Sequence, residues 1–183
     1  RTLLNDQRGQ LVSGSGLDLN LDRLDNAGLL LVGDDFTLQS NALTNRGDIQ
    51  AENLNLRLTN TFTNQGNTLA SNAATLAAAN LTNSGTVAGK TLELTELRNS
   101  GLMQGTNAID AAATRFINET TGKGLSGGAL TLQGGQFSNA GILQGDTLAV
   151  NGGALTNSGT LNGLSGLTGT FTGTLTNTGL VQS

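Results

Sequence analysis

An Asn-x-Gly tripeptide recurs eight times along this chain of 183 residues, at intervals close to nineteen residues. A fixed period of this length is typical of stacked structural repeats, and it constrains the fold more than any other feature of the sequence. The asparagines that mark the repeat are Asn26, Asn45, Asn64, Asn83, Asn99, Asn139, Asn157 and Asn177.

Apolar residues recur at fixed distances from this marker. Two residues before each Asn stands a Leu or a Phe, provided that Asn5 and Asn118 are counted as degenerate copies. Two residues after each Gly stands an aliphatic residue or Met, except at Thr68 and Gly124, each of which is followed at once by a Leu. We therefore expect two buried columns, with a one-residue bulge at each of the two exceptions.

A third set of apolar residues alternates with polar ones. Alternation with period two indicates a half-buried strand, and no stretch of the chain carries a sustained helical pattern. Each repeat therefore holds about three short strands with turns between them. The alternating pairs are Leu17/Leu19, Phe36/Leu38, Leu54/Leu56, Leu92/Leu94, Leu130/Leu132 and Leu148/Val150.

Short strands repeated in this way predict an all-β parallel β-helix, because no single repeat buries its apolar face alone but a stack does so continuously. The spacings drift between 16 and 21 residues, which favours a right-handed coil over a left-handed one built on hexapeptides. Nine to ten coils at the spacing of neighbouring strands give a rod of roughly 45 Å. We expect one repeat domain over residues 1–183, and since both ends fall inside a coil, an internal fragment of a much longer rod.

The Asn and the Gly of the marker have separate expected roles. Gly takes positive φ without a Cβ clash, so we expect it to permit the corner between two strands. Asn bonds its own backbone at turns, and stacked Asn side chains bond from coil to coil in cross-β structures. We therefore predict that the eight marker asparagines form a structural ladder along one corner.

The composition excludes several classes of function. The chain has no Pro, Cys, His, Trp or Tyr, which removes disulfides, thiolate metal sites and the commonest general base. Its net charge is −4 and its nine basic residues are scattered, whereas a nucleic-acid site needs a basic stripe. No apolar run reaches the length of a membrane span. We expect no cofactor, no metal, no nucleic-acid partner and no membrane insertion of this segment.

The repeat is most irregular over residues 107–128. The marker is stretched there, from Asn118 to Gly122, and we expect a longer loop that leaves the rod. Loops on a rigid scaffold often carry recognition. The candidate recognition residues are Glu119, Thr120, Thr121 and Lys123. After Lys123 the only charged residue is Asp146, which leaves a neutral, hydroxyl-rich stretch that suits contact with a partner or reflects ordinary repeat drift.

The unit LTNSGTVAGKTLEL at residues 81–94 resembles the repeat of filamentous haemagglutinin and of CdiA-type contact-dependent inhibition exoproteins. The resemblance covers nearly the whole chain. It implies a right-handed β-helical shaft, exported through an outer-membrane two-partner transporter and located at the bacterial cell surface or secreted. Members act as adhesins, or hold a receptor-binding region or toxin away from the cell. Neither the secretion domain nor a toxin domain of the family is recognisable here.

Three kinds of function follow from these observations. The leading one is a rigid extracellular shaft whose parent protein binds a receptor or glycan on a host or bacterial cell. The second is that the segment itself binds a receptor or glycan. The third is a β-helical polysaccharide-degrading enzyme, which we do not expect, because its candidate groups are sparse.

The candidate enzymatic groups fall in two places. Asp34 and Asp35 stand at a turn, with Glu52 and Asn53 in the next coil. Glu96 and Arg115 hold the same position in successive coils, where a surface ion pair explains them better than catalysis. The sequence also lacks the nonapeptides of calcium-binding solenoids and the paired threonine columns of ice-binding ones.

Overall fold

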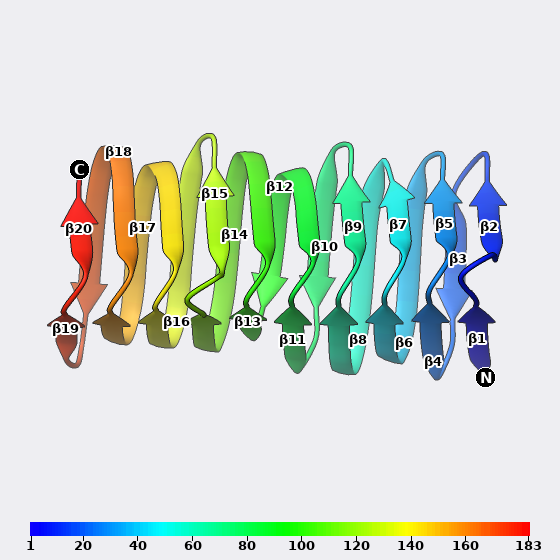
Figure 1. The fold of residues 1–183 in the computed structure, drawn as a ribbon, viewed down its shortest axis with the longest axis horizontal. Coiled ribbons are helices and arrows are strands. Elements are labelled where there is room, and N and C mark those ends of the chain that lie inside the picture. The colour runs from blue at the N-terminus through cyan, green and yellow to red at the C-terminus, as the bar shows by residue number, and fades with distance from the viewer.

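The computed structural model describes all 183 residues, which wind into a single rod of about ten coils without any helix (Figure 1). The coils are built from twenty strands that join one continuous parallel sheet. In order along the chain these are β1 Thr2–Asn5, β2 Gln10–Ser13, β3 Leu17–Asn20, β4 Arg23–Asn26, β5 Leu29–Val32, β6 Asp35–Asn45, β7 Asp48–Ala51, β8 Asn53–Asn64, β9 Asn67–Ala70, β10 Ala73–Ala77, β11 Asn80–Asn83, β12 Thr86–Thr95, β13 Leu97–Asn99, β14 Leu102–Asn118, β15 Lys123–Ser126, β16 Ala129–Asn139, β17 Ile142–Asn157, β18 Thr160–Phe171, β19 Leu175–Asn177 and β20 Leu180–Gln182.

Each coil contributes one segment to each of three faces. The first face ends at the marker Asn and includes β1, β4, β11, β13 and β19. The second follows the Gly and includes β2, β5, β7, β9, β15 and β20. The third carries the alternating pairs and includes β3 and β10. The longer strands β6, β8, β12, β14, β16, β17 and β18 continue from one face to another.

The rod is right-handed, as the drifting spacings predict. In Figure 1 the chain rises along the near side through β1 and β2, crosses at the top and descends on the far side through β3, while each coil lies to the left of the one before. Successive strands pair in parallel and in register, for example Leu24 of β4 with Leu43 of β6 and Leu54 of β8 with Ala74 of β10. Equivalent residues of neighbouring coils therefore lie directly over one another.

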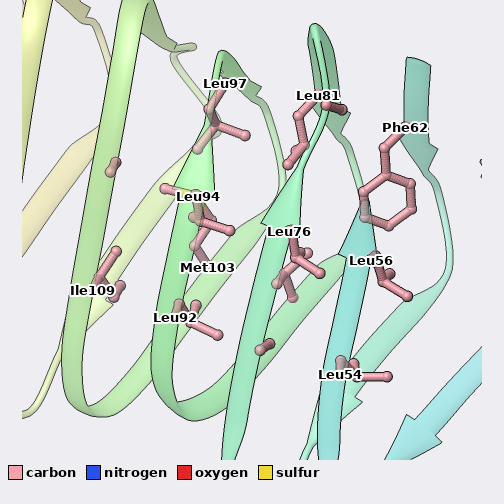
Figure 2. Packing of buried hydrophobic residues seen from close by; sticks show 14 of the residues in the cluster. Leu54, Leu56, Phe62, Leu76, Leu81, Leu92, Leu94, Leu97, Met103 and Ile109 are labelled. Atoms are coloured by element: carbon pink, nitrogen blue, oxygen red, sulfur yellow. The ribbon is translucent and has the colours of Figure 1, made fainter. Parts of the chain in front are cut away.

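The core is one apolar cluster of 34 buried residues that runs along the inside of the rod. Figure 2 shows its rows, in which Phe62, Leu81 and Leu97 line the first face and Leu56, Leu76 and Leu94 line the third. Buried and more exposed residues alternate along the short strands in the middle of the rod, as in β11, where only Leu81 and Asn83 are buried. This pattern confirms the predicted β-helix and its columns.

The two expected bulges are absent. Thr68 pairs in unbroken register with Ile49 and Val87, and it is completely buried. Its hydroxyl donates to the side-chain oxygen of Asn64 (3.0 Å), so the polar atom is satisfied inside the core. The prediction was wrong because it assumed that only an aliphatic side chain fits this column.

Gly124 also keeps the register, between Met103 and Leu143. A Cβ at this glycine would lie 2.8 Å from Leu143 Cδ2 and 3.1 Å from Met103 Cε. The larger neighbours therefore fill the space that an aliphatic side chain takes in other coils. The chain needs no bulge here, since the side chains of Met103 and Leu143 in the two neighbouring coils fill the volume that Gly124 leaves.

The expected loop over residues 107–128 is absent as well. Strand β14 runs without interruption from Leu102 to Asn118, and β15 begins at Lys123. Ten residues of β14 pair with β16, from Ala108 to Asn118 with one position skipped, so the segment lies within the sheet. The stretched marker adds only a short turn, because the extra residues fold back over the preceding coil.

Candidate functional site

The marker asparagines form a column along the corner between the first and second faces. The amide Nδ2 of each donates to the Oδ1 of the Asn in the following coil, over 2.7–2.9 Å, as in Asn45 to Asn64 and Asn64 to Asn83. The second amide hydrogen reaches main-chain carbonyls, such as Asn67 O for Asn45 (2.8 Å). All of them except those of the two end coils are at most 1% exposed.

The column contains ten asparagines rather than eight, because Asn5 and Asn118 take part in it. Asn118 donates to Asn139 and accepts from Asn99, both over 2.8 Å, in spite of the stretched tripeptide that follows it. The sequence signal for these two members was the Leu or Phe two residues earlier, which places the Asn in the column whether or not a Gly follows at the usual distance.

The corner glycines are needed for close approach rather than for positive φ. Of all the glycines, only Gly134 has φ in the positive range, so the predicted left-handed conformation at the marker Gly is wrong. A Cβ on Gly47, Gly66 or Gly85 would instead lie 2.1 Å from the carbonyl oxygen of the Gly one coil earlier. Coils separated by only one strand spacing leave no room for a side chain at this point.

We name this unit the Asn–Gly corner and define it as the marker Asn through its Gly, for example residues 64–66. The opposite corner, between the third and first faces, we name the variable corner; it comprises residues 77–80, 95–96 and 112–115 in three successive coils. Its length differs from coil to coil, whereas the Asn–Gly corner keeps one length in eight of the ten coils.

The candidate recognition residues lie on the turn after Asn118. The Arg98 guanidinium pairs with the Glu119 carboxylate (2.5 Å), and the Thr121 hydroxyl donates to Ser100 O (2.7 Å). Gly122 N donates to Glu119 O (2.8 Å), which closes the turn. Thr120, Thr121 and Lys123 are exposed and Glu119 is half-buried. The turn thus lies against the preceding coil, and its role in recognition stays a prediction.

The candidate enzymatic residues are placed in structural roles. Asp35 Oδ1 accepts from Asn53 Nδ2 (2.8 Å), and Glu52 N donates to Asp34 O (3.0 Å). No group of three or more acidic residues gathers where a metal ion could bind. These contacts tie neighbouring coils together on the surface of the rod.

The predicted ion pair between Glu96 and Arg115 is wrong. The Glu96 carboxylate accepts from the main-chain N–H of Thr114 (2.6 Å) and of Arg115 (3.3 Å) instead of meeting the guanidinium. Burial acts to raise the pKa of Glu96, but these hydrogen bonds outweigh it and hold that pKa below the usual value for a glutamate. This role of Glu96 was not predicted, because the sequence alone does not show which corner of the coil is shortened between Asn83 and Asn99.

Comparison with known proteins identifies the repeat. A family of sequences described as haemagglutinin repeat matches residues 1–66, 49–90 and 69–179, which together cover nearly the whole chain. The chain belongs to the haemagglutinin repeat family. In this chain, the Asn–Gly corner and the three apolar columns are the features of the sequence that form the stack.

Among curated proteins, the haemagglutinin repeats of this chain are similar to the 16S rRNA endonuclease CdiA of Enterobacter cloacae subsp. cloacae, with 41% identity over 149 residues. That alignment covers 79% of this chain and 4% of the relative's length. No solved structure matches. The structure holds no helix long and apolar enough to cross a membrane.

Proposed function

We propose that this chain is a segment of the rigid extracellular shaft of a large secreted bacterial exoprotein, an adhesin or a contact-dependent growth inhibition protein. The observation that carries the proposal is the uninterrupted stack: ten coils share one sheet, one apolar core and one column of bonded asparagines. The shaft projects a distal receptor-binding or effector region of the parent protein away from the cell that makes it.

The mechanism of such a shaft is mechanical. The backbone contributes 146 hydrogen bonds, and most of them join one coil to the next along the rod axis. Bending or stretching the rod would lengthen many of these bonds together and open a close-packed interior, both of which are unfavourable. The family similarity supports export through an outer-membrane two-partner transporter and location at the cell surface, which we include in the proposal.

Deleting one whole coil from the parent protein tests this function. Removing residues 65–83 joins Asn64 to Ser84-Gly85 and so restores an Asn–Gly corner. The rod should stay folded, remain displayed on the cell and shorten by about 4.8 Å, the spacing of one strand. Electron microscopy and circular dichroism would measure length and folding. Loss of the β-sheet signal after this deletion would count against a modular shaft.

A matched deletion of residues 65–74 is the control. It removes about half a coil, so the apolar columns of the two remaining parts no longer align, and we expect the protein to unfold or aggregate. Equal tolerance of both deletions would show that register between coils does not hold the rod together. The parent protein's receptor binding should survive the whole-coil deletion if the segment only carries a distal region.

A binding role of the segment itself is the alternative. The side chains of Thr120, Thr121 and Lys123, which follow Asn118, favour it, because they are exposed and available for contact with a partner. A glycan array and a cell-binding assay with the 183-residue chain would test it, with a Thr120→Ala/Lys123→Ala variant as the matched control. Absence of binding at millimolar glycan would remove this alternative.

A further inference from the structure

The coil from Asn83 to Asn99 spans 16 residues, whereas the other coils span 18–21. Compared with the 19-residue coils before and after it, the coil lacks one residue near Gly89 and Thr91, where its register with β14 shifts, and two residues in the variable corner. Four residues separate Leu76 from Leu81 in the coil before, and four separate Ala111 from Phe116 in the coil after, but only Thr95 and Glu96 separate Leu94 from Leu97. Two peptide groups that neighbouring coils use for pairing are therefore missing.

Toward the preceding coil, the Thr95 side chain takes the place of a peptide group. Its hydroxyl donates to Ala78 O (3.2 Å) and accepts from Ala78 N (3.1 Å), which is the pattern that a main-chain N–H and C=O would make together. One main-chain hydrogen bond to the preceding coil remains here, in which Leu81 N donates to Glu96 O (2.8 Å). Both main-chain groups of Ala78 and the N–H of Leu81 are therefore satisfied.

Toward the following coil, the Glu96 carboxylate takes the place of a carbonyl. Two consecutive N–H groups, those of Thr114 and Arg115, donate to its Oε1 and Oε2. At the same corner near the start of the rod, the N–H groups of Asn41 and Ala42 both donate to one main-chain carbonyl, Asp22 O (3.2 Å each). The carboxylate therefore occupies the position where a peptide oxygen of the longer coils lies.

The backbone at Glu96 is also unusual. Its φ of 45° makes it the one non-glycine residue of this chain with positive φ, a conformation that L-residues rarely adopt. A glycine would relieve that strain but would have no carboxylate to offer. A strained glutamate at this position indicates that the side chain contributes more to the fold than the backbone conformation costs.

We propose that Thr95 and Glu96 form an acid-sensitive side-chain splice that replaces two missing peptide groups and holds the shortest coil in the stack. The splice acts on both neighbours, through the hydroxyl on one side and the carboxylate on the other. Only the carboxylate titrates, so acid loosens the contact with the following coil and leaves the contact with Ala78 intact.

The charged groups around Glu96 are few. Arg98 lies two residues along β13 and pairs with Glu119, and Arg115 belongs to the following coil; both line the same surface depression as Glu96. The preceding coil contributes only uncharged residues to that depression, 79–82. Glu93 and Asp110 lie next to each other in register on the adjoining third face.

The direction of the pH effect follows from the pKa of Glu96. Because that pKa is lower in the folded chain than in the unfolded chain, the splice contributes its full stability above the ordinary glutamate value of about 4.3. The contribution is lost as the pH falls through the lower folded value. Above neutral pH the splice should show no further change.

Hydrogen exchange of the 183-residue chain, resolved by residue with NMR, tests the proposal. Rates at about pH 6 and about pH 3 are corrected for intrinsic exchange, and the amides of residues 61–64 serve as an internal reference for global opening. We expect the protection of the Thr114 and Arg115 amides to fall about tenfold relative to that reference in acid. Unchanged relative protection in the wild-type chain would overturn the proposal.

Two variants provide the matched comparison. Glu96→Gln should lower the protection of Thr114 and Arg115 already near neutral pH and should remove the further fall in acid. Glu93→Gln, in the same coil, should behave as the wild type, because the Glu93 carboxylate accepts only from the Thr75 hydroxyl (3.1 Å). If both variants change the protection of these amides equally, the splice is not specific to Glu96 and the proposal is wrong.

A direct titration covers the case in which Glu96→Gln fails to fold. The carboxyl carbon signal of Glu96 in the wild-type chain should titrate below the ordinary glutamate value, and Thr95→Val should weaken protection at Ala78 without shifting that titration. A Glu96 titration at or above the ordinary value would contradict the splice.

Discussion

Two of the three corners of the rod, the Asn–Gly corner and the variable corner, handle variation in opposite ways. The Asn–Gly corner places a buried amide and a side-chain-free glycine against the coil below, and its marker residues bond to one another in every coil. The variable corner holds as few as two residues and as many as five, and most of its side chains are exposed or half-buried, although Ala78 and Ala113 are buried. Tight packing on one side fixes the register, so the other side is free to change in length.

This difference locates the part of the repeat that the fold depends on most. A buried amide must find partners for a donor group and an acceptor group, and the two neighbouring asparagines supply them. At the variable corner, water or a nearby side chain satisfies the N–H and C=O groups that have no main-chain partner, as the side chains of Thr95 and Glu96 do. Three substitutions or insertions would test the comparison, and we take them from the largest expected effect to the smallest.

Asn64→Leu should be the most damaging of the three. It keeps the approximate volume but leaves the Asn45 amide without its acceptor and the Asn83 oxygen without its donor, and it also removes the acceptor of the Thr68 hydroxyl. We expect the free energy of unfolding in urea to fall by about 4 kcal/mol. Asn60→Leu, at an exposed position, is the control and should change it by less than about 0.5 kcal/mol. Similar losses in both variants would refute a special role for the column.

Gly66→Ala should have an intermediate effect. The added Cβ would lie 2.1 Å from Gly47 O, so the two coils must move apart locally. We expect a loss of about 2 kcal/mol in the free energy of unfolding. Gly14→Ala is the matched control, because no atom lies within 4 Å of the Cβ that it adds. A neutral Gly66→Ala would mean that coil spacing at this corner is looser than the structure shows.

An insertion in the variable corner should have the smallest effect. Two residues, Gly-Ser, placed between Ala78 and Ala79 lengthen a corner that already differs between coils, so the added loop entropy is the main cost. We expect the free energy of unfolding to fall by less than about 1 kcal/mol. A loss as large as that of Asn64→Leu would show that the two corners are equally constrained.

The sequence was sufficient to predict the fold because its strongest signals report the inside of the rod. Leu and Phe columns in fixed register with an Asn define a stack without any knowledge of distances. Two inner pairs, Ala74/Leu76 and Ile109/Ala111, escaped this reasoning, although all four side chains are buried. Alanine occurs on both sides of strands, so its pattern alone does not show which face it occupies.

The details of the candidate site were harder to predict, since they depend on contacts between coils. The reason for the corner glycine is a carbonyl oxygen nineteen residues earlier in the chain, which no local turn preference reports. The expected loop before Lys123 and the ion pair of Glu96 failed for the same cause. The turn after Asn118 and the Glu96 carboxylate both bond to main-chain groups of an adjacent coil. A sequence pattern does not show contacts of this kind.

The orientation of the asparagine amides has a consequence for how such rods join. Every Nδ2 points toward the later coil and every Oδ1 toward the earlier one, so the side-chain dipoles add along the axis in a single sense. The two ends of the column therefore differ chemically, one offering an oxygen and the other a hydrogen. Continuation of the column requires head-to-tail addition, because two like ends would bring donor against donor or acceptor against acceptor.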